Sequence, residues 1–538
     1  MIVMTEIPIS MFERRKARRP SDALPVLDAI EIEWSPATLQ ALLARELPGA
    51  QVIVVSNREP YIHNQSENGP ALQIPASGLV TALEPVMRAC GGTWVAHGSG
   101  TADRETSDAD GRIRVPIDAP AYTLRRVWLS DEDVDGYYYG FANEALWPLC
   151  HNAFVRPTFR QTDWDTYVDV NRRFAEAAVA EATTEDPIVL VQDYHFALVP
   201  KFLREHLPKA TILTFWHIPW PNAETFGTCP WKEAIVEGLL GSTVIGFHTR
   251  SHCNYFLETV DRYVESRIDR EQSTVSFGSF ETTVKPYPIS IEWPPTVLAG
   301  QNSMRACRRN VRDRLALRVD THLAVGIERF DYTKGIPEKM EAVDAFLERW
   351  PEWNGRFCLY LAIAPTRTKL AAYQELQQRV AALADDINCR HRTDGGVPAI
   401  ILAIRHHEPP EVFELFRAAD TCLVTSLQDG MNLVAKEFVA SRDDAQGVLI
   451  LSEFADASRD LAEALIVNPY DTQGTAEAIQ RAVTMPAFEQ SERMRSMRRQ
   501  VRVRNVFRWA GQMLFDLARL RKRQRIDDLA DLTVAGDD

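Results

Sequence analysis

Ten short apolar runs, each bounded by polar or turn-forming sequence, limit what this chain can fold into. Such runs are typical of strands buried on both faces of a parallel sheet, and helical stretches such as residues 165–182 and 231–240 separate them. The runs form two series, at residues 52–57, 188–193, 212–217 and 243–248, and at residues 323–328, 357–364, 399–404, 421–426, 447–452 and 464–469. Two such series, joined near residues 286–295, predict an α/β fold of two facing, Rossmann-like, doubly wound parallel-sheet domains.

The length of 538 residues also favours more than one domain, because a single hydrophobic core rarely grows so large. We place an N-terminal extension at residues 1–48, a first Rossmann-like domain at 49–292, a second at 293–490, and a C-terminal helix and tail at 491–538. The extension contains a basic run at residues 14–19. We expect it to be a partly disordered, solvated arm; docking to a partner or to nucleic acid is the alternative.

The composition, 45% apolar and 25% charged, is that of a soluble globular enzyme. A formal net charge of -14 argues against nucleic acid as the main partner, because phosphate backbones require basic faces. No apolar run is long enough to cross a membrane and the N-terminus lacks a signal-like apolar region, so we expect a cytoplasmic protein with no membrane partner. The eight cysteines lack paired or metal-ligand spacing and are expected to be buried and reduced.

The segment from residue 424 to residue 439 predicts an anion-binding site. An apolar strand is followed by a turn with Asp429 and Gly430, and a helix is expected to begin at Asn432. Free backbone N–H groups and the helix dipole both face such a loop, which therefore suits a phosphate. Asp429 before this site, and Glu437 within the helix, are placed to hold hydroxyls beside a bound phosphate.

Arg329 and Lys334 lie five residues apart, directly after another predicted strand. Two cations on one loop suit a diphosphate leaving group, because they stabilise the charge that develops as it departs. The alternative is a pair of unrelated surface charges. The anion-binding helix at Asn432 favours the functional interpretation.

Three further polar residues follow predicted strands, where ligands bind in doubly wound sheets. Arg58 is suited to a bidentate phosphate contact or to a structural ion pair. Asp193 is suited to sugar hydroxyls, to proton transfer, or to capping the next helix. His217 precedes a proline-rich loop and is interpreted as a ligand contact or as a structural histidine. Tyr138 and Trp147, in an aromatic-rich stretch, line a pocket or belong to the core.

Eight motifs, in this order, resemble those of the trehalose-6-phosphate synthase family of retaining glycosyltransferases. They are SNR (56–58), LWPL (146–149), DYH (193–195), HIPWP (217–221), ERFDYTKGIP (328–337), DGMNLVAKEF (429–438), GVLILSEFA (447–455) and VNPYD (467–471). The resemblance implies a GT-B fold with a final helix that crosses back to the first domain. It also implies transfer of glucose from UDP-glucose to glucose 6-phosphate with retained configuration, no metal and no other cofactor.

The resemblance assigns roles to the matching positions. Arg329 and Lys334 would bind the donor diphosphate with backbone groups near Gly78, Gly430, Met431, Asn432 and Leu433, and Glu437 would hold the ribose. Asp429 and His217 would contact the donor sugar, and these two, with Asp193, Arg329 and Lys334, form the expected catalytic set. The expected acceptor pocket consists of Arg58, Tyr138, Trp147, Asp193 and Arg367. The expected partners are small-molecule substrates, and the oligomeric state stays open, a homo-oligomer included.

The chain departs from the family pattern at several positions. Ser77 stands where a second glycine is usual before Gly78, Gln428 stands where arginine is common, and Asp456 replaces a glycine. Arg367 lies in APTRTK, where the family has APTSRG. A related family that makes glucosylglycerol phosphate from ADP-glucose and glycerol 3-phosphate is the alternative, as is a catalytically silent sugar-phosphate sensor.

Overall fold

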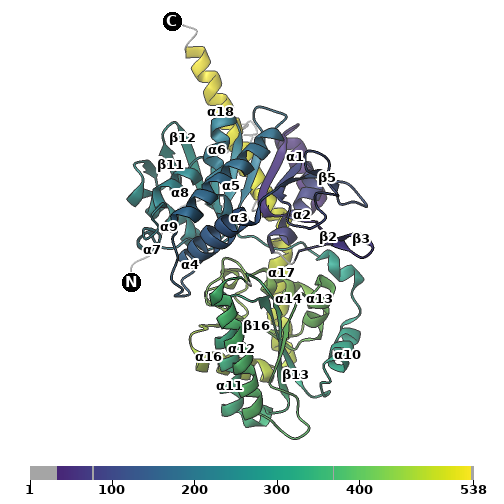
Figure 1. The fold of residues 1–538 in the computed structure, drawn as a ribbon. Coiled ribbons are helices and arrows are strands. Elements are labelled where there is room, and N and C mark those ends of the chain that lie inside the picture. Colours follow the sequence, from purple (N-terminus) through teal and green to yellow (C-terminus); the bar gives the residue numbers. More distant parts are fainter. Residues whose placement is uncertain (1–32, 76–77, 368, 535–538) are drawn as a thin grey trace, which may run out of the picture. The chain divides into compact units, whose positions relative to one another are not determined.

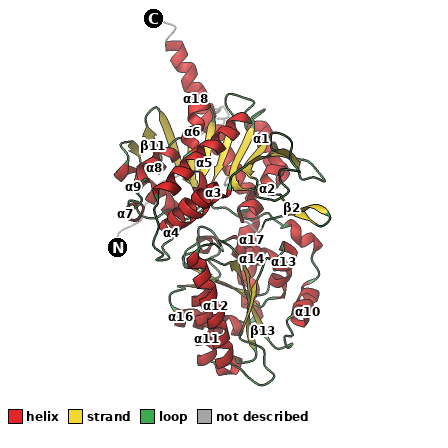
Figure 2. Ribbon diagram, viewed as in Figure 1, coloured by secondary structure: helices red, strands yellow, loops and turns green. Residues whose placement is uncertain are grey.

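Two large β-sheets carry the fold (Figures 1 and 2). The computed structural model describes residues 33–75, 78–367 and 369–534. The first sheet has ten strands in the order β10-β11-β12-β9-β8-β7-β1-β4-β6-β5, and the second has six in the order β15-β14-β13-β16-β17-β18. We call each sheet with its helices the N-terminal lobe and the C-terminal lobe. The predicted α/β class with two doubly wound sheets is confirmed.

The strands of the N-terminal lobe are β1 (Val52–Arg58), β4 (Thr93–His97), β5 (Arg112–Val115), β6 (Tyr122–Val127), β7 (Ile188–Gln192), β8 (Thr211–Phe215), β9 (Val244–Phe247), β10 (Arg267–Asp269), β11 (Thr274–Phe277) and β12 (Phe280–Pro286). All predicted apolar runs of this lobe are strands. The inner strand β4 was not predicted, and neither were the antiparallel pairs at the two ends of the sheet, β5–β6 and β10–β11–β12. Their strands are short and partly polar, so they lack the apolar signal of a doubly buried strand. A separate hairpin, β2 (Ile62–Ser66) and β3 (Gly69–Gln73), lies between β1 and α2 in the chain.

Strand β1 shows why the central runs are continuously apolar. Val52 and Val54 face a core shared with helices α1 (Pro36–Glu46), α2 (Gly78–Cys90) and α18 (Val506–Val534). Ile53 and Val55 face the opposite core, with α5 (Gln161–Ala180) and α6 (Val199–His206). Side chains alternate between the two faces of a strand, so covering both faces with helices requires an apolar residue at every position.

The remaining helical elements of this lobe connect its strands. They are α3 (Asp131–Asp133), the π-helix η1 (Val134–Leu146), α4 (Trp147–Cys150), the 3-10 turn η2 (Tyr194–Phe196), α7 (Ala223–Phe226), α8 (Lys232–Leu239) and α9 (Arg250–Tyr263). Tyr138 and Trp147 lie on η1 and at the start of α4. A π-helix is a rare conformation that occurs frequently at functional sites.

The C-terminal lobe is a parallel sheet covered on both faces. Its strands are β13 (His322–Arg329), β14 (Phe357–Ala364), β15 (Ile400–Ile404), β16 (Thr421–Val424), β17 (Val448–Ser452) and β18 (Leu465–Val467). Figure 1 shows α11 (Ile336–Arg349), α12 (Ala371–Arg390) and α16 (Thr472–Thr484) on one face, and α10 (Met304–Arg314) and α13 (Pro409–Ala418) on the other. The shorter elements are η3 (Thr296–Gly300), η4 (Tyr332–Lys334), η5 (Pro351–Trp353), α14 (Leu433–Ser441) and α15 (Ala457–Asp460).

The last two helices link the lobes. Helix α17 (Ala487–Val503) packs on α14 of the C-terminal lobe, and α18 packs on α1, α2 and β8 of the N-terminal lobe. A Cβ atom at Gly511 of α18 would lie 2.0 Å from the indole ring of Trp34, so this close contact requires glycine. The predicted return of the C-terminal helix is confirmed.

Helix α1 belongs to the residues assigned to the N-terminal extension, yet it lies within the compact unit that begins at Trp34. The four domain boundaries themselves stay a prediction. The basic run at residues 14–19, and Ser77, lie outside the described residues.

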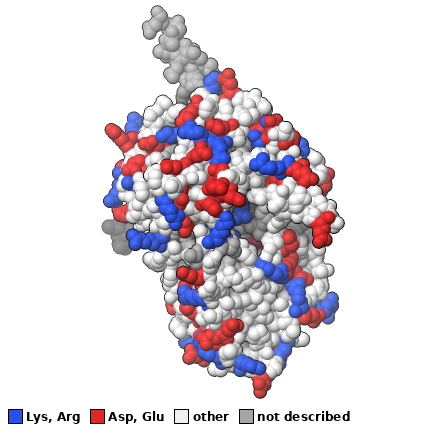
Figure 3. All heavy atoms as spheres, in the orientation of Figure 1, with Lys and Arg blue, Asp and Glu red and all other residues white. Residues whose placement is uncertain are grey.

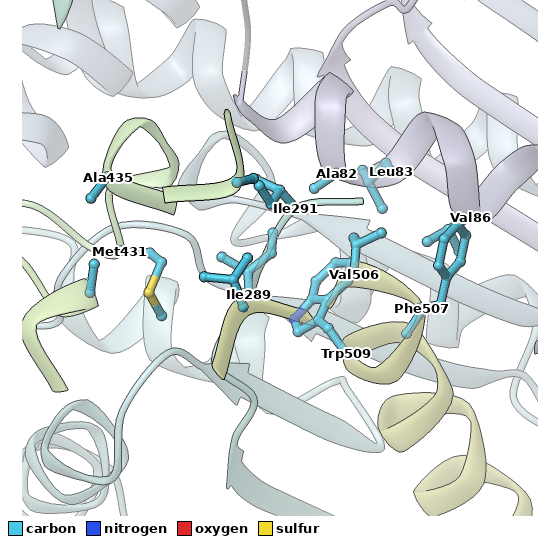
Figure 4. Packing of buried hydrophobic residues seen from close by; sticks show 14 of the residues in the cluster. Ala82, Leu83, Val86, Ile289, Ile291, Met431, Ala435, Val506, Phe507 and Trp509 are labelled. Carbon is cyan, nitrogen blue, oxygen red and sulfur yellow. The ribbon is translucent and has the colours of Figure 1, made fainter. Parts of the chain in front are cut away.

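One apolar cluster extends across both lobes. Figure 4 shows Ile289 and Ile291, from the segment between the lobes, beside residues of α2, α18 and the start of α14. The labelled neighbours are Ala82, Leu83, Val86, Met431, Ala435, Val506, Phe507 and Trp509. This shared core holds the carboxyl ends of the two sheets toward a common space.

The surface carries charges of both signs, interspersed on the face drawn in Figure 3. Within the described residues, no helix combines the length and apolar character needed to span a membrane. All eight cysteines are free, as expected, but the expectation of burial is wrong for Cys389, which is exposed, and only partly met at Cys90.

Candidate active site

A pocket of about 500 Å³ lies between the carboxyl ends of the two sheets. Strands β1, β7 and β8 lead into it from the N-terminal lobe, and β13 and β14 lead into it from the C-terminal lobe. Every residue predicted for the site lines it: Arg58, Gly78, Tyr138, Trp147, Asp193, His217, Arg329, Lys334, Arg367, Asp429, Gly430, Met431, Asn432, Leu433 and Glu437. The structure therefore brings these residues together, while their individual roles stay predictions.

Two helix N-termini converge on one side of the pocket. Helix α2 begins at Gly78 and helix α14 begins at Leu433. A Cβ atom on Gly78 would lie 3.3 Å from Cδ1 of Leu433, so the two ends are in contact range. The side chain of Asn432 caps α14 by accepting a hydrogen bond from the Ala435 N–H at 3.1 Å. Two sets of free N–H groups and two positive dipole ends therefore face the same space.

Lys334 and Asp429 form an ion pair beside these helix ends, with 2.5 Å between Nζ and Oδ2. Asp429 also accepts hydrogen bonds from Asn432 at 3.0 Å and Ser426 at 3.3 Å. Burial raises the pKa of Asp429, but the charge and hydrogen bond of Lys334, together with the Asn432 bond, lower it below its ordinary value. Asp429 is therefore ionised at neutral pH and holds the Lys334 ammonium at the pocket wall.

At Gly430 the backbones of the two lobes lie close together. A Cβ atom there would lie 2.3 Å from the carbonyl oxygen of His217, so only glycine fits. The same carbonyl accepts a hydrogen bond from Nε2 of His248 at 3.0 Å. Burial holds the pKa of His217 well below its usual value, so its imidazole is neutral and acts through hydrogen bonds. Its Nε2 lies 2.9 Å from Oε1 of Gln192.

Asp193 fits both interpretations of its sequence position. It lines the pocket, and its Oδ1 also accepts hydrogen bonds from the N–H groups of Tyr194 at 2.9 Å and His217 at 3.2 Å. Its backbone has a φ of 75°, a strained value for a residue other than glycine. Burial raises its pKa to about 7, although the two N–H groups act in the opposite direction.

The acceptor side of the pocket is rich in cations. An Nη of Arg58 donates to the phenol oxygen of Tyr138 at 3.3 Å, and the Tyr138 ring stacks on His195 with centroids 5.8 Å apart. Burial raises the pKa of Tyr138, but the positive charges of Arg58, Arg367 and Arg329 outweigh it and bring the pKa down to about 8. This direction shows that the field at Tyr138 is strongly positive.

Arg367 is more firmly held than the sequence indicates. Its Nη1 lies 2.7 Å from Oδ2 of Asp331 and donates to the Tyr373 hydroxyl at 2.6 Å. The guanidinium also lies over the Trp147 ring, 4.0 Å from its centroid. Despite burial, Arg367, Arg329 and Lys334 hold the pKa of Asp331 at about 2. The charge of Arg367 is therefore partly neutralised by Asp331 in the pocket wall.

Glu437 lies on α14, inside the pocket. Burial raises the pKa of its carboxyl to about 7. No hydrogen-bond partner for it occurs among the residues that the structure describes. An unpaired carboxylate in such a place is suited to a pair of vicinal hydroxyls.

Several lining residues were missed at the sequence level: Gln192, Tyr194, His195, His151 and His248. Tyr194 and His195 belong to the DYH motif and His151 follows LWPL, so membership of a motif was the available signal. Across residues 33–75, 78–367 and 369–534, no group of three or more histidine, cysteine or carboxylate side chains is placed to hold a metal ion. The expectation of a metal-free enzyme stays a prediction.

Two of the departures from the family pattern can be located in the structure. Asp456 lies 3.0 Å from Nε2 of His252, a hydrogen-bond contact that joins the C-terminal lobe to α9 of the N-terminal lobe. Gln428 is held by its backbone N–H, which donates to the Thr333 carbonyl at 3.4 Å.

A family model described as glycosyltransferase family 20 matches residues 50–519. The chain belongs to this family. This family 20 chain is 38% identical over 481 residues to a trehalose-6-phosphate synthase of Mycolicibacterium vanbaalenii, in a match that covers 87% of the chain and 96% of the relative. It is 36% identical over 479 residues to a bifunctional trehalose-6-phosphate synthase/phosphatase of Thermoproteus tenax, covering 87% of the chain but only 63% of that relative's length.

A solved structure shares the architecture. It is that of a UDP-forming α,α-trehalose-phosphate synthase from Burkholderia xenovorans in complex with glucose-6-phosphate. The TM-score is 0.76 at 31% identity, and the match covers 87% of this family 20 chain and all of that one, 100%. The predicted GT-B fold is confirmed.

Proposed function

We propose that this family 20 glycosyltransferase transfers glucose from UDP-glucose to the anomeric hydroxyl of glucose 6-phosphate, with retention of configuration. The product is α,α-trehalose 6-phosphate, which places the enzyme in trehalose biosynthesis. The names of the relatives support this activity, and the geometry of the pocket supplies the physical argument. The observation that carries it is the pairing of two distinct anion sites in one pocket, one built mainly from helix ends and one mainly from arginine side chains.

The first anion site suits a nucleoside diphosphate. The N-termini of α2 and α14 supply N–H donors, and Arg329 and Lys334 supply positive charge beside them. Charge that develops on the leaving diphosphate is stabilised by groups already fixed in place, which is the largest contribution that most enzymes make to such a step. Glu437, on α14, is placed for the ribose hydroxyls of the same ligand.

The second anion site suits the phosphate of a sugar phosphate. Arg58 and Arg367 face it from different lobes, with Tyr138 and Trp147 between them. A guanidinium binds phosphate through two parallel hydrogen bonds, and this fixes the orientation of the ligand as well as its position. Asp193, at the end of β7, is then placed for the hydroxyls of the acceptor sugar.

Transfer with retention proceeds by attack on the same face as the departing group. The bond from C1 of glucose to the diphosphate oxygen breaks as the bond from C1 to the acceptor hydroxyl oxygen forms. The proton of the acceptor hydroxyl passes to the departing phosphate oxygen, so UDP leaves with that proton. The neutral imidazole of His217 and the carboxylate of Asp429 hold the donor sugar during this step.

A grid of nucleoside-diphosphate release tests the proposal. UDP-, ADP- and GDP-glucose are each combined with glucose 6-phosphate and with glycerol 3-phosphate. We expect release of UDP with glucose 6-phosphate and none above background with glycerol 3-phosphate. Release with glycerol 3-phosphate alone would assign the chain to the glucosylglycerol-phosphate reaction. If folded protein releases no nucleoside diphosphate in any combination, the result would favour a sugar-phosphate sensor.

A further inference from the structure

His151 is a buried histidine of the pocket wall that the reaction described above does not use. It is the residue at which α4 ends, it is 3% exposed, and it lines the pocket. Its ring lies against the indole of Trp147, with 4.1 Å between the ring centroids. The imidazole is therefore fixed by packing on a residue of the proposed acceptor pocket.

The hydrogen bonding of His151 leaves one ring nitrogen available. Nδ1 lies 2.8 Å from the carbonyl oxygen of Trp147, an acceptor, so Nδ1 carries the proton and donates it. Burial lowers the pKa of His151 to about 4, and the Trp147 carbonyl only partly offsets this effect. The neutral ring then has a lone pair on Nε2. Among the described residues, no donor lies within hydrogen-bond distance of Nε2.

The charged groups that act on His151 indicate which part of the pocket it faces. They are Asp331, Asp429 and Lys334. Lys334 and Asp429 form the ion pair beside the two helix N-termini, where the donor diphosphate and its sugar are expected. His151 therefore lies in the pocket wall packed on Trp147 and within the electrostatic range of the Lys334–Asp429 pair.

We infer that His151 is a specificity-determining residue, whose Nε2 accepts a hydrogen bond from one hydroxyl of the transferred glucose. This inference rests on the proposed function, because it names a contact within the same transfer. An unpaired acceptor in a buried site penalises any ligand that lacks the matching donor, so the contact selects the sugar. Trp147 acts as the support that keeps the ring in this orientation.

The test pairs changes in the protein with changes in the donor. The kcat/KM values of the wild type, His151→Phe and His151→Gln are measured with UDP-glucose and with its 2-, 3-, 4- and 6-deoxy analogues. For the wild type we expect kcat/KM to fall about tenfold when one of these hydroxyls is absent, which is the value of a neutral hydrogen bond. His151→Phe keeps the ring packing but lacks the acceptor, so its kcat/KM with UDP-glucose should be about tenfold below that of the wild type. Removing the sensitive hydroxyl from the donor should then lower the kcat/KM of this variant no further.

The glutamine variant separates a contact from a structural role. The Oε1 of glutamine reaches roughly the place of Nε2, so His151→Gln should restore discrimination at that hydroxyl. A purely structural role would lower kcat/KM by one factor for all donors and leave the deoxy profile unchanged, and this result would overturn the inference. A profile that changes only with deoxy analogues of glucose 6-phosphate would also overturn it.

His322→Phe serves as the matched control. His322 also stacks on an aromatic ring, that of Phe357 at 5.9 Å, and also has one hydrogen bond, to Thr421 at 2.8 Å, but it lies outside the pocket lining. Its deoxy profile should equal that of the wild type. If the wild type releases no UDP, the proposed function fails. Calorimetric binding of UDP-glucose and the deoxy donors to the same variants then tests His151 separately.

Discussion

The two anion sites of the pocket neutralise charge in different ways. We call Arg329, Lys334, Asp429 and the first turns of α2 and α14 the donor cluster, and Arg58, Tyr138, Trp147 and Arg367 the acceptor cluster. In the donor cluster the Lys334 ammonium is paired with Asp429 at 2.5 Å, and backbone N–H groups supply many of the donors. In the acceptor cluster Arg58 contacts a phenol at 3.3 Å and, within the described residues, has no carboxylate in ion-pair range.

This difference indicates how each cluster acts. Backbone dipoles cannot be titrated away and are fixed by the helices, so the donor cluster suits a diphosphate that gains further negative charge during bond cleavage. In the acceptor cluster Arg367 is paired with Asp331, whereas Arg58 has no carboxylate in ion-pair range among the described residues. Arg58 therefore supplies the uncompensated charge for a phosphate that arrives with its full charge. Loss of a donor-cluster cation should therefore lower kcat, and loss of an acceptor-cluster cation should raise one KM.

Arg329→Ala should have the largest effect. Removing the guanidinium leaves the developing diphosphate charge with less compensation, and we expect kcat to fall about 1000-fold. Arg329 has no ion-pair partner among the described residues, and the buried Asp331 keeps Arg367 at 2.7 Å, so thermal unfolding should stay near that of the wild type. Steady-state UDP release and circular dichroism together check both statements.

Arg356→Ala is the matched control for this change. Arg356 lies 5.5 Å from the Trp353 ring centroid, just as Arg329 lies 5.5 Å from that of Trp147, but it is outside the pocket. Its kcat should equal that of the wild type. Turnover retained in Arg329→Ala would contradict the assignment of the donor cluster.

Arg58→Ala should act on the acceptor alone. We expect KM for glucose 6-phosphate to rise about 100-fold, the value of a charged bidentate contact, while KM for UDP-glucose changes less than about twofold. Arg58→Lys keeps the charge but not the planar fork, so it should recover only part of the affinity. Equal changes in the KM values for glucose 6-phosphate and UDP-glucose would contradict the assignment of Arg58 to a separate acceptor cluster.

The donor cluster could be predicted from local sequence, whereas parts of the acceptor cluster could not. A strand, a loop with Asp429 and Gly430, and a helix at Asn432 are consecutive in the chain, so their geometry follows from local rules. The pairing of Arg367 with Asp331 joins two loops of the C-terminal lobe, and no periodicity in the sequence shows it.

The same reasoning explains the elements that were missed. Strands β5 and β6 pair with each other at the end of the first sheet, and β6 alternates buried and partly exposed positions over most of its length. Most inner strands are covered by helices on both faces and therefore have the continuous apolar signal that the sequence shows. The inner strand β4 was missed because its apolar run has only three residues, between Thr93 and His97. His151 was missed because its role depends on which nitrogen the Trp147 carbonyl engages, a detail that only packing determines.

The acceptor cluster should also show its own pH dependence. The pKa of Tyr138 is about 8, since the three arginines lower it by more than burial raises it. Above that pH the phenolate places a negative charge beside the phosphate, so KM for glucose 6-phosphate should rise by up to about tenfold at pH 9. The phosphate itself is already a dianion there, since its second pKa is about 6. Tyr138→Phe should remove this rise, and KM for UDP-glucose should lack it in both proteins.

The contact of His252 and Asp456 offers the smallest and most discriminating test, because neither residue lines the pocket and the contact joins the two lobes. The two side chains are 8% and 18% exposed and lie 3.0 Å apart. A double-mutant cycle of His252→Ala and Asp456→Ala in urea should give a coupling energy of about 1 kcal/mol, more than a typical exposed pair. The exposed pair of Lys201 and Glu237, within the N-terminal lobe, should give about 0.3 kcal/mol. Since the link acts on the approach of the two lobes, both KM values should rise by the same small factor, about twofold, and kcat should stay unchanged. A change confined to one substrate would mean that this link belongs to one of the clusters.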